Sequence, residues 1–179
     1  MVRWTLLVIL LCSPGVYAQI LNRWNFIMVG KPNDYQNGVG RPDPETTHNG
    51  APSIYIRSRI ALPEEEGTFI QTIDADPYRG KRIRFHAFVK SENVSTWAGL
   101  WMRIIFDPST GSAIETDNME NRPIRGTTDW NEYAVVLNVA PMAARVAYGI
   151  TLHGAGNIWL SEAKVEVVGQ EIPTTGGTK

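Results

Sequence analysis

The segment KRIRFHAFVK, from Lys81 to Lys90, decides the fold class. Ile83, Phe85, Ala87 and Val89 lie at alternate positions, and the residues between them are charged or polar except for Phe88. An apolar side chain at every second position is typical of a β-strand that buries one face.

The same alternation recurs along the chain, and no stretch of ten residues shows the 3.6-residue apolar period of a helix. Further strands are expected in six ranges: 53–60, 68–73, 100–106, 133–139, 146–152 and 158–168. Such strands bury their apolar faces by packing two antiparallel sheets together. The sequence therefore predicts an all-β protein, an antiparallel β-sandwich of the jelly-roll type. The expected core comprises Ile83, Phe85, Val89, Leu100, Met102, Ile104, Leu137 and Ile150.

Two segments lack this pattern. The range 30–52 is rich in Gly, Pro, Asn and Asp, and we expect it to form a long loop. The range 169–179 contains few apolar residues and is expected to be a flexible C-terminal tail.

The first 18 residues have the layout of a secretory signal peptide. Arg3 precedes an apolar run, and Val16-Tyr17-Ala18 offers small or β-branched residues before a cut at Gln19. The run is shorter than the roughly 20 apolar residues that a membrane-spanning helix needs. We expect a secreted or periplasmic chain with its folded domain at 19–168 and no membrane span after cleavage. Attachment of a lipid at Cys12 is disfavoured, because leucines and not a small residue precede it.

Composition excludes several classes of protein. The chain is 43% hydrophobic and carries 17 basic and 18 acidic residues, for a net charge of −1. This balance argues against a disordered chain and against a polybasic nucleic-acid binder. Cleavage before Gln19 would also remove Cys12, the chain's only cysteine, so we expect neither a disulfide nor a thiolate metal site.

The sequence contains no H-E-x-x-H motif, no G-x-S-x-G motif and no glycine-rich phosphate-binding loop. Its three histidines are far apart, and no cofactor is expected. Asp34, Asp43 and Glu45 leave open a structural calcium ion, because carboxylate and carbonyl oxygens are the ligands that calcium takes.

The most informative strand for function is 100–106. If Leu100 and Met102 fill the core, then Trp101 and Arg103 face away from it. An exposed indole beside a guanidinium suits recognition, since the indole stacks on apolar surfaces and Arg donates forked hydrogen bonds. In the alternative, a loop covers Trp101 and an acidic residue pairs with Arg103.

Other polar residues extend this candidate ligand site. The strand 146–152 places small residues, Gly149 among them, on its outer face. They form either the floor of a groove that ends at His153 or a place where another backbone approaches closely. Further candidates on a neighbouring strand and a loop are Arg84, His86, Asp117, Asn118 and Arg122.

With these residues, the sequence resembles the carbohydrate-binding-module type of jelly roll, a galactose-binding-like β-sandwich found in bacterial exported proteins. The resemblance spans 24–168 and rests on WAGLWMR at 97–103, DNM at 117–119, RPI at 122–124, GTTDW at 126–130 and Tyr133. It implies a non-catalytic domain that binds sugars on one sheet face. Ser161 departs from the Asp expected after the tryptophan of the last strand.

Three functions are therefore considered. The first is an exported, non-catalytic module that binds a poly- or oligosaccharide through the outward face of Trp101 and Arg103. The second is a structural or interaction domain of the cell envelope, with an envelope protein or an enzyme as its partner. The third is a small hydrolase or lyase that uses outward carboxylates with His86 or His153.

Overall fold

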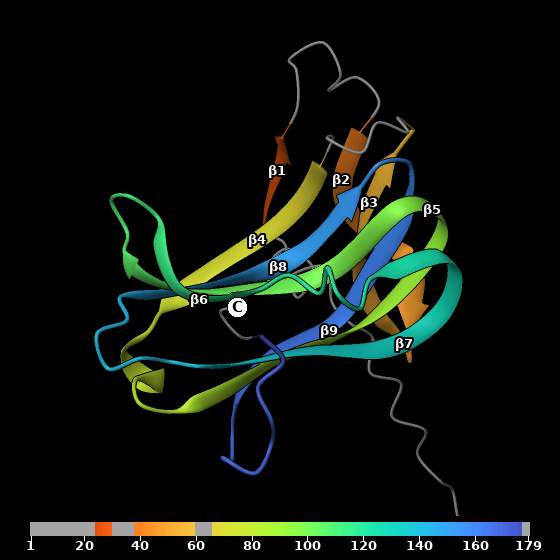
Figure 1. Ribbon diagram of the computed structural model, residues 1–179. Helices are drawn as coiled ribbons and strands as arrows, with labels where there is room; N and C mark the ends of the chain where they lie inside the picture. Colours follow the sequence, from red (N-terminus) through yellow and green to blue (C-terminus); the bar gives the residue numbers. More distant parts are fainter. Residues whose placement is uncertain (1–23, 30–37, 60–65, 177–179) are drawn as a thin grey trace, which may run out of the picture.

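The computed structural model describes residues 24–29, 38–59 and 66–176, and the predicted signal peptide lies outside them. Figure 1 shows two layers of antiparallel strands, confirming the predicted β-sandwich. The strands are β1 (Asn25–Val29), β2 (Gly38–His48), β3 (Ala51–Ser58), β4 (Glu66–Asp74), β5 (Arg82–Asp107), β6 (Ser112–Asp117), β7 (Ile124–Asn138), β8 (Arg145–His153) and β9 (Gly156–Val168), with a short 3-10 helix at Asp76–Tyr78. None of the described residues forms a helix long and apolar enough to cross a membrane.

The long strand β5 belongs to both layers. Its first half pairs with β7 and β9, and its second half pairs with β8 and β6. The register with β7 shifts between Val89 and Ala98, and Asn93 in this stretch has a positive φ of 53°. Such irregularities bend a strand, which lets β5 turn from one layer into the other (Figure 1).

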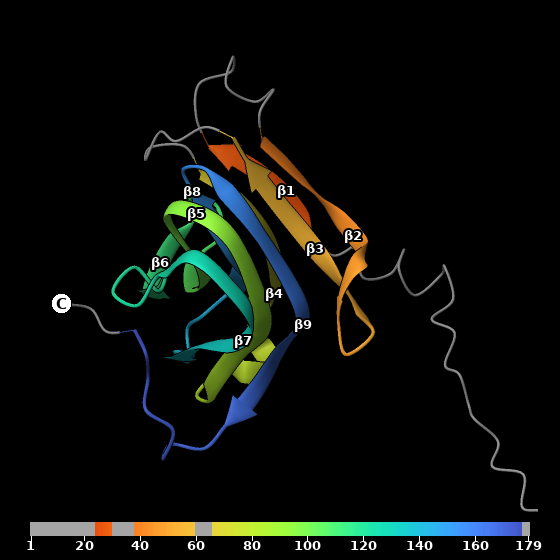
Figure 2. The ribbon, with the colours of Figure 1, turned by 90° about the vertical axis from the view of Figure 1, so that its right-hand side faces the viewer.

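The two layers follow from the pairing order β1-β4-β8-β5-β9-β3-β2. We call the layer of β1, β4, β8, the second half of β5 and β6 the groove sheet. The layer of β2, β3, β9, the first half of β5 and β7 is called the back sheet; Figure 2 shows its strands side by side.

The core between the sheets matches the prediction. All eight expected core residues are buried, and Phe85 is fully enclosed with its ring centroid 4.8 Å from that of Tyr148. Period-two alternation thus identified the inward faces of β5, β7 and β8 correctly.

The predicted long loop at 30–52 is partly wrong, because Gly38–His48 forms strand β2. This strand pairs with β3 and turns back at Asn49 and Gly50, which both have positive φ. Pro42 is tolerated because β2 is the edge strand of its sheet, where one side of the backbone needs no partner.

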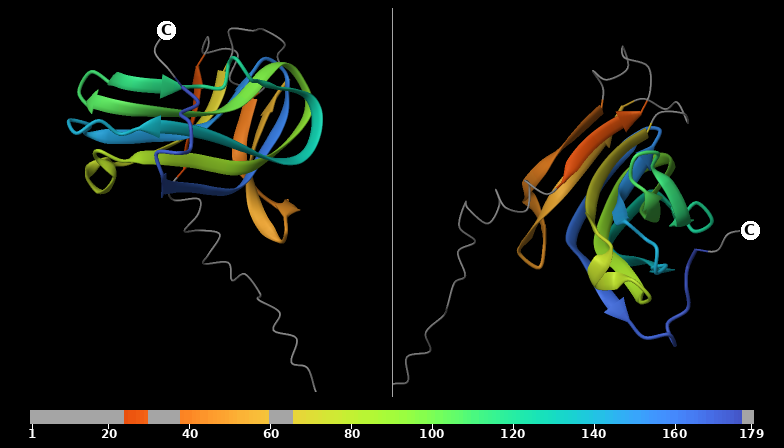
Figure 3. Two further views of the ribbon diagram at one scale, coloured as in Figure 1. Left: turned by 60° about the horizontal axis from the view of Figure 1, so that its bottom comes forward. Right: turned by 90° about the vertical axis from the view of Figure 1, so that its left-hand side faces the viewer.

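The C-terminal segment is also more ordered than the sequence suggests. Arg82 donates hydrogen bonds to the carbonyls of Gln170 and Ile172, at 2.7 and 2.5 Å. The backbone N–H of Thr175 donates to the carbonyl of Val136 on β7. Figure 3 (left) shows this segment running back across the strands from the end of β9. The expectation of a flexible tail therefore fails for 169–176, and 177–179 lie outside the described residues.

Candidate functional site

A groove of about 560 Å³ lies on the outer face of the groove sheet. Its lining comes from β1, β4, β5, β8 and the β6–β7 connection: Ile27, Glu66, Thr68, Ile70, Trp97, Trp101, Arg103, Asn118, Glu120, Thr151 and His153. Four residues of the sequence-predicted site, Trp101, Arg103, Asn118 and His153, are therefore brought together.

Strand register explains why these residues meet. Trp97 on β5 is opposite His153 on β8, which is opposite Glu66 on β4. Two residues further along β5, Gly99 is opposite Thr151. Directly paired residues point to the same face of a sheet, so each cross-strand row contributes to one surface.

The next row contains Trp101, Gly149 and Ile70, and the row after it contains Arg103 opposite Ala147. Trp97 and Trp101 lie four residues apart on one strand, which corresponds to about 13 Å at the usual rise per residue. The groove thus has two aromatic side chains on one face of β5.

Of the small residues on the outward face of β8, Thr151 lines the groove, whereas Ala147 and Gly149 do not. A Cβ added at Gly149 would lie 1.8 Å from the carbonyl oxygen of Phe69 and 3.0 Å from Cζ2 of Trp101. The structure favours the second interpretation of Gly149, a close approach of another backbone, because the Phe69 carbonyl and the Trp101 indole leave no room there for a side chain. The indole of Trp101 lies over Gly149 and donates a hydrogen bond from Nε1 to Thr68 Oγ1, at 3.0 Å.

Trp101 and Arg103 hold each other in place. The guanidinium carbon of Arg103 lies 5.7 Å from the centroid of the Trp101 ring, a cation–π arrangement. Arg103 is exposed, and no ion pair to it is found among the described residues. Of the two alternatives drawn from the sequence, the one with an acidic partner for Arg103 is therefore not seen in this part of the chain.

An aromatic pair lies at the other end of the groove. The rings of Trp97 and His153 are stacked, with centroids 4.1 Å apart and planes 17° apart. Glu66 Oε1 accepts a hydrogen bond from Thr151 Oγ1 at 2.7 Å, and its Oε2 lies 3.8 Å from His153 Nε2. This end offers a stacking surface together with hydrogen-bonding groups.

The β6–β7 connection forms one side of the groove. A Cβ at Gly99 would lie 3.0 Å from Cβ of Met119, so the connection rests directly on β5. Met119 is buried in the core, while Asn118 and Glu120 on either side of it line the groove.

Asp117 and Arg122 do not line the groove, which corrects the sequence prediction. Arg122 forms a two-pronged ion pair with the buried carboxylate of Asp117, and Thr175 Oγ1 donates to that carboxylate at 2.6 Å. Burial by itself would raise the pKa of Asp117. The hydrogen bonds from Arg122, Thr175 and the Met119 amide outweigh it and hold the pKa below its ordinary value. The pair anchors the β6–β7 connection and the C-terminal segment.

Arg84 and His86 are on the outer face of the back sheet, so the expectation that they share the groove is wrong. Arg84 pairs with Glu132 at 2.7 Å, and His86 Nδ1 lies 2.8 Å from the same carboxylate. Both residues belong to the first half of β5, which is in the opposite layer from Trp101.

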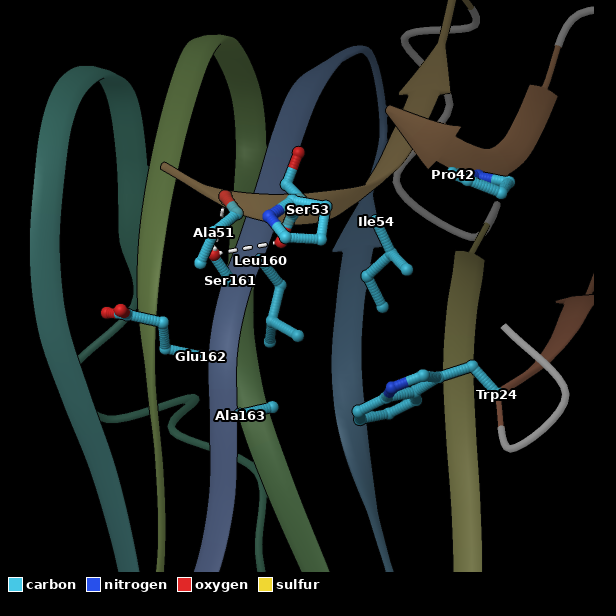
Figure 4. Close-up of a pocket in the computed structure, with 10 residues that line it drawn as sticks. Trp24, Pro42, Ala51, Ser53, Ile54, Leu160, Ser161, Glu162 and Ala163 are labelled. Carbon is cyan, nitrogen blue, oxygen red and sulfur yellow. Dashed lines mark hydrogen bonds between the residues drawn. The ribbon is translucent and has the colours of Figure 1, made fainter. Parts of the chain in front are cut away.

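A smaller cavity opens between the edges of the two sheets, with a volume of about 180 Å³. Figure 4 shows Trp24, Ile54 and Leu160 around this opening, with Ser161 hydrogen-bonded to the carbonyls of Ala51 and Pro52. The cavity contains none of the sequence-predicted site residues.

The suggested calcium ligands are only partly described. Asp34 lies outside the described residues. Asp43 accepts hydrogen bonds from Trp159 Nε1 and from the amides of Glu45 and Thr46, so both of its oxygens have protein partners. In the described part of the chain, no three His, Cys, Asp or Glu residues are placed to hold a metal ion.

Solved structures with a similar fold include carbohydrate-binding modules. The C-terminal family 22 carbohydrate-binding module of Clostridium thermocellum Xyn10B superposes with a TM-score of 0.52 at 15% identity, over 86% of this chain and 90% of that one. A family 22 xylan-binding domain of Paenibacillus barcinonensis Xyn10C gives 0.51 at 12% identity, over 80% and 86%. The chain has the fold of carbohydrate-binding modules.

The fold also occurs within larger proteins. An enzymatically active domain of tailspike protein 4 from bacteriophage CBA120 superposes with a TM-score of 0.63 at 16% identity, over 83% of this chain but 20% of that one. At these identities the likeness establishes the β-sandwich and does not identify a ligand.

Among curated proteins, a relative is 38% identical over 178 residues: the "Uncharacterized HTH-type transcriptional regulator YbfP" of Bacillus subtilis (strain 168). The match covers 90% of this chain and 59% of the relative, so the chain spans less than two thirds of that protein. The described residues contain no α-helix and therefore no helix-turn-helix. No family model matches the sequence.

Sequence reasoning missed several groove residues. Glu66 and Thr68 line the groove but stand in a strand whose outward positions carry no unusual pattern. Trp97 was recognised only as part of the family-like segment. A usable signal was its spacing of four from Trp101, because an even spacing places both rings on one face of a strand.

Proposed function

We propose that this chain is an exported, non-catalytic carbohydrate-binding module whose ligand lies in the groove of the groove sheet. The observation that carries the proposal is that Trp97 and Trp101 lie on one face of β5, in a groove that Thr68 and Thr151 also line. Sugar rings have apolar faces that stack on indoles and hydroxyl groups that exchange hydrogen bonds with carboxylates, amides and imidazoles.

Each end of the groove supplies both kinds of contact. Trp97 is accompanied by Glu66 and His153, and Trp101 is accompanied by Arg103. The spacing of the two tryptophans suits an oligosaccharide of several units and not a single sugar. Export is proposed from the predicted signal peptide, and the fold shared with carbohydrate-binding modules supports the choice of ligand class.

The test is binding of the full chain to a panel of immobilised poly- and oligosaccharides. Trp101→Ala should weaken binding about 30-fold or more, since truncation of a dominant aromatic contact costs about 2 kcal/mol or more. Trp130→Ala is the matched control. Trp130 is a partly buried tryptophan near His48 on the back sheet, and its loss should leave binding unchanged.

Two outcomes contradict the proposal. Failure of the chain to bind any member of the panel would remove the proposed function. Equal binding by wild type and Trp101→Ala would place the ligand elsewhere. Turnover of a panel member, lost on substitution of one groove carboxylate, would instead support a hydrolase or lyase.

The similarity to a transcriptional regulator favours a second candidate, in which the domain senses a ligand for an attached domain. Asn118 lines the groove, and its neighbour Asp117 bonds Thr175 of the C-terminal segment. Occupancy of the groove would then alter hydrogen exchange at 170–176. Exchange that is the same with and without bound sugar would exclude this role.

A further inference from the structure

Charge is unevenly distributed along the groove. Among the described residues, Arg103 is the only Lys or Arg that lines the groove, and it lies at one end, while Glu66 and His153 lie together at the other end. Trp97 and Arg103 lie six positions apart on β5, which corresponds to about 20 Å at the usual strand rise. A ligand in the groove therefore meets a carboxylate at one end and a guanidinium at the other.

The groove carboxylates already have partners in the protein. Glu66 accepts a hydrogen bond from Thr151, and Glu120 Oε2 lies 3.4 Å from Asn118 Nδ2. Arg103 differs from them. Its cross-strand neighbours on the same face are Ala147 on β8 and Thr116 on β6, and neither is acidic.

Arg103 is also the exception among the arginines near this face. Arg122 and Arg145 are paired with Asp117 and Asp74, whereas no described carboxylate pairs with Arg103. Its guanidinium is held over the ring of Trp101, where a stacked sugar would lie beside it. Stacking a neutral sugar there would take a cation out of water with no opposite charge to compensate it.

We propose that the groove selects an acidic oligosaccharide, in which the carboxylate of a uronic acid unit at Trp101 is bound by Arg103. The planar guanidinium fork matches the geometry of a carboxylate and can form two parallel hydrogen bonds with it. The Glu66 end accepts the hydroxyls of a neighbouring unit. This inference rests on the proposed carbohydrate-binding function and adds the chemical class of the ligand.

The test compares oligogalacturonide, oligomannuronide and glucuronoxylan oligosaccharides with their carboxyl-reduced counterparts, using the full chain. At least one acidic member should bind about tenfold more tightly than its reduced counterpart, because hydrogen bonds between two charged groups are stronger than those to a neutral hydroxyl. Arg103→Gln should remove this preference, so that the acidic member and its reduced counterpart bind the variant with affinities within about threefold of each other. Raising the salt concentration should weaken the preference.

Arg125→Gln is the matched control, because Arg125 is exposed, lies outside the groove and loses the same charge. Arg103→Lys keeps the charge without the fork and should retain a smaller preference. Arg103→Lys also tests whether the guanidinium fork binds the carboxylate if Arg103→Gln does not fold.

The outcomes separate the two proposals. Binding of neutral and acidic members with equal affinity, still lost in Trp101→Ala, would overturn the acidic ligand and leave the proposed function intact. Tighter binding of a sulfated oligosaccharide than of any uronide would overturn the assignment to a carboxylate. Binding of no member of either panel would remove both proposals.

Discussion

Gly149 is the position where one added methyl group tests the construction of the groove. The substitution Gly149→Ala would place Cβ 1.8 Å from the carbonyl oxygen of Phe69 and 3.0 Å from Cζ2 of Trp101. The carbonyl belongs to the main chain of β4 and cannot rotate away as a side chain does. Strands β4 and β8 must therefore move apart, and the indole of Trp101 must leave its position over Gly149.

The cost follows from these contacts. Overpacking a well-filled site costs about 1–3 kcal/mol, and loss of the hydrogen bond from Trp101 to Thr68 adds about 1 kcal/mol. We expect Gly149→Ala to lower the free energy of unfolding by about 2–4 kcal/mol. Sugar binding should also fall by at least about tenfold, because Trp101 no longer lies in its stacking position.

A urea titration followed by tryptophan fluorescence measures the first effect, and retention on a bound polysaccharide measures the second. Gly80→Ala is the control. It has a φ of +72° and no neighbouring atom within 4 Å, so alanine there adds only backbone strain of about 1–2 kcal/mol. A Gly149→Ala protein that is as stable as wild type and binds equally well would refute the close packing of β4 and Trp101 against Gly149.

Three further predictions concern stability. Phe85→Ala should lower the free energy of unfolding by about 3–5 kcal/mol in a urea titration, because it empties a fully buried ring position. Asp117→Asn should weaken the fold by about 1–3 kcal/mol at neutral pH, because Arg122 loses a charged partner. The lowered pKa of Asp117 means that its contribution is complete above the ordinary Asp value of about 3.9 and is lost as pH falls through the folded-state pKa. Across this acid range, the free energy of unfolding of Asp117→Asn should therefore depend less steeply on pH than that of wild type. An unchanged slope would argue against the ion pair. Thr175→Val keeps the side-chain shape but removes the hydroxyl between Asp117 and Val136, so hydrogen exchange at 170–176 should accelerate while the groove sheet is unaffected.

The sequence was sufficient for the inward faces of the strands. Phe85 and Leu100 were assigned to the core from alternation alone, and both are fully buried. The same rule placed Trp101 and Arg103 together on an outward face, because residues two apart on a strand share a side. These inferences depend only on neighbouring positions in the chain. They therefore hold without knowledge of which strands are paired.

The sequence did not show where strand β5 leaves one layer and enters the other. Arg84 and Trp101 belong to the same strand, yet they lie on the outer faces of opposite sheets because β5 bends between Val89 and Ala98. A bulge shifts the register by amounts that depend on the partner strand, and the bend follows from that pairing.

The set of residues that line the groove was likewise decided by tertiary structure. Glu66 meets His153 and Trp97 only because β4, β8 and β5 are adjacent in a particular register. A shift of one residue in either pairing would move every outward side chain to the core. That register is fixed by burial of the whole apolar face, a property of all the strands together, and no local pattern in one strand contains it.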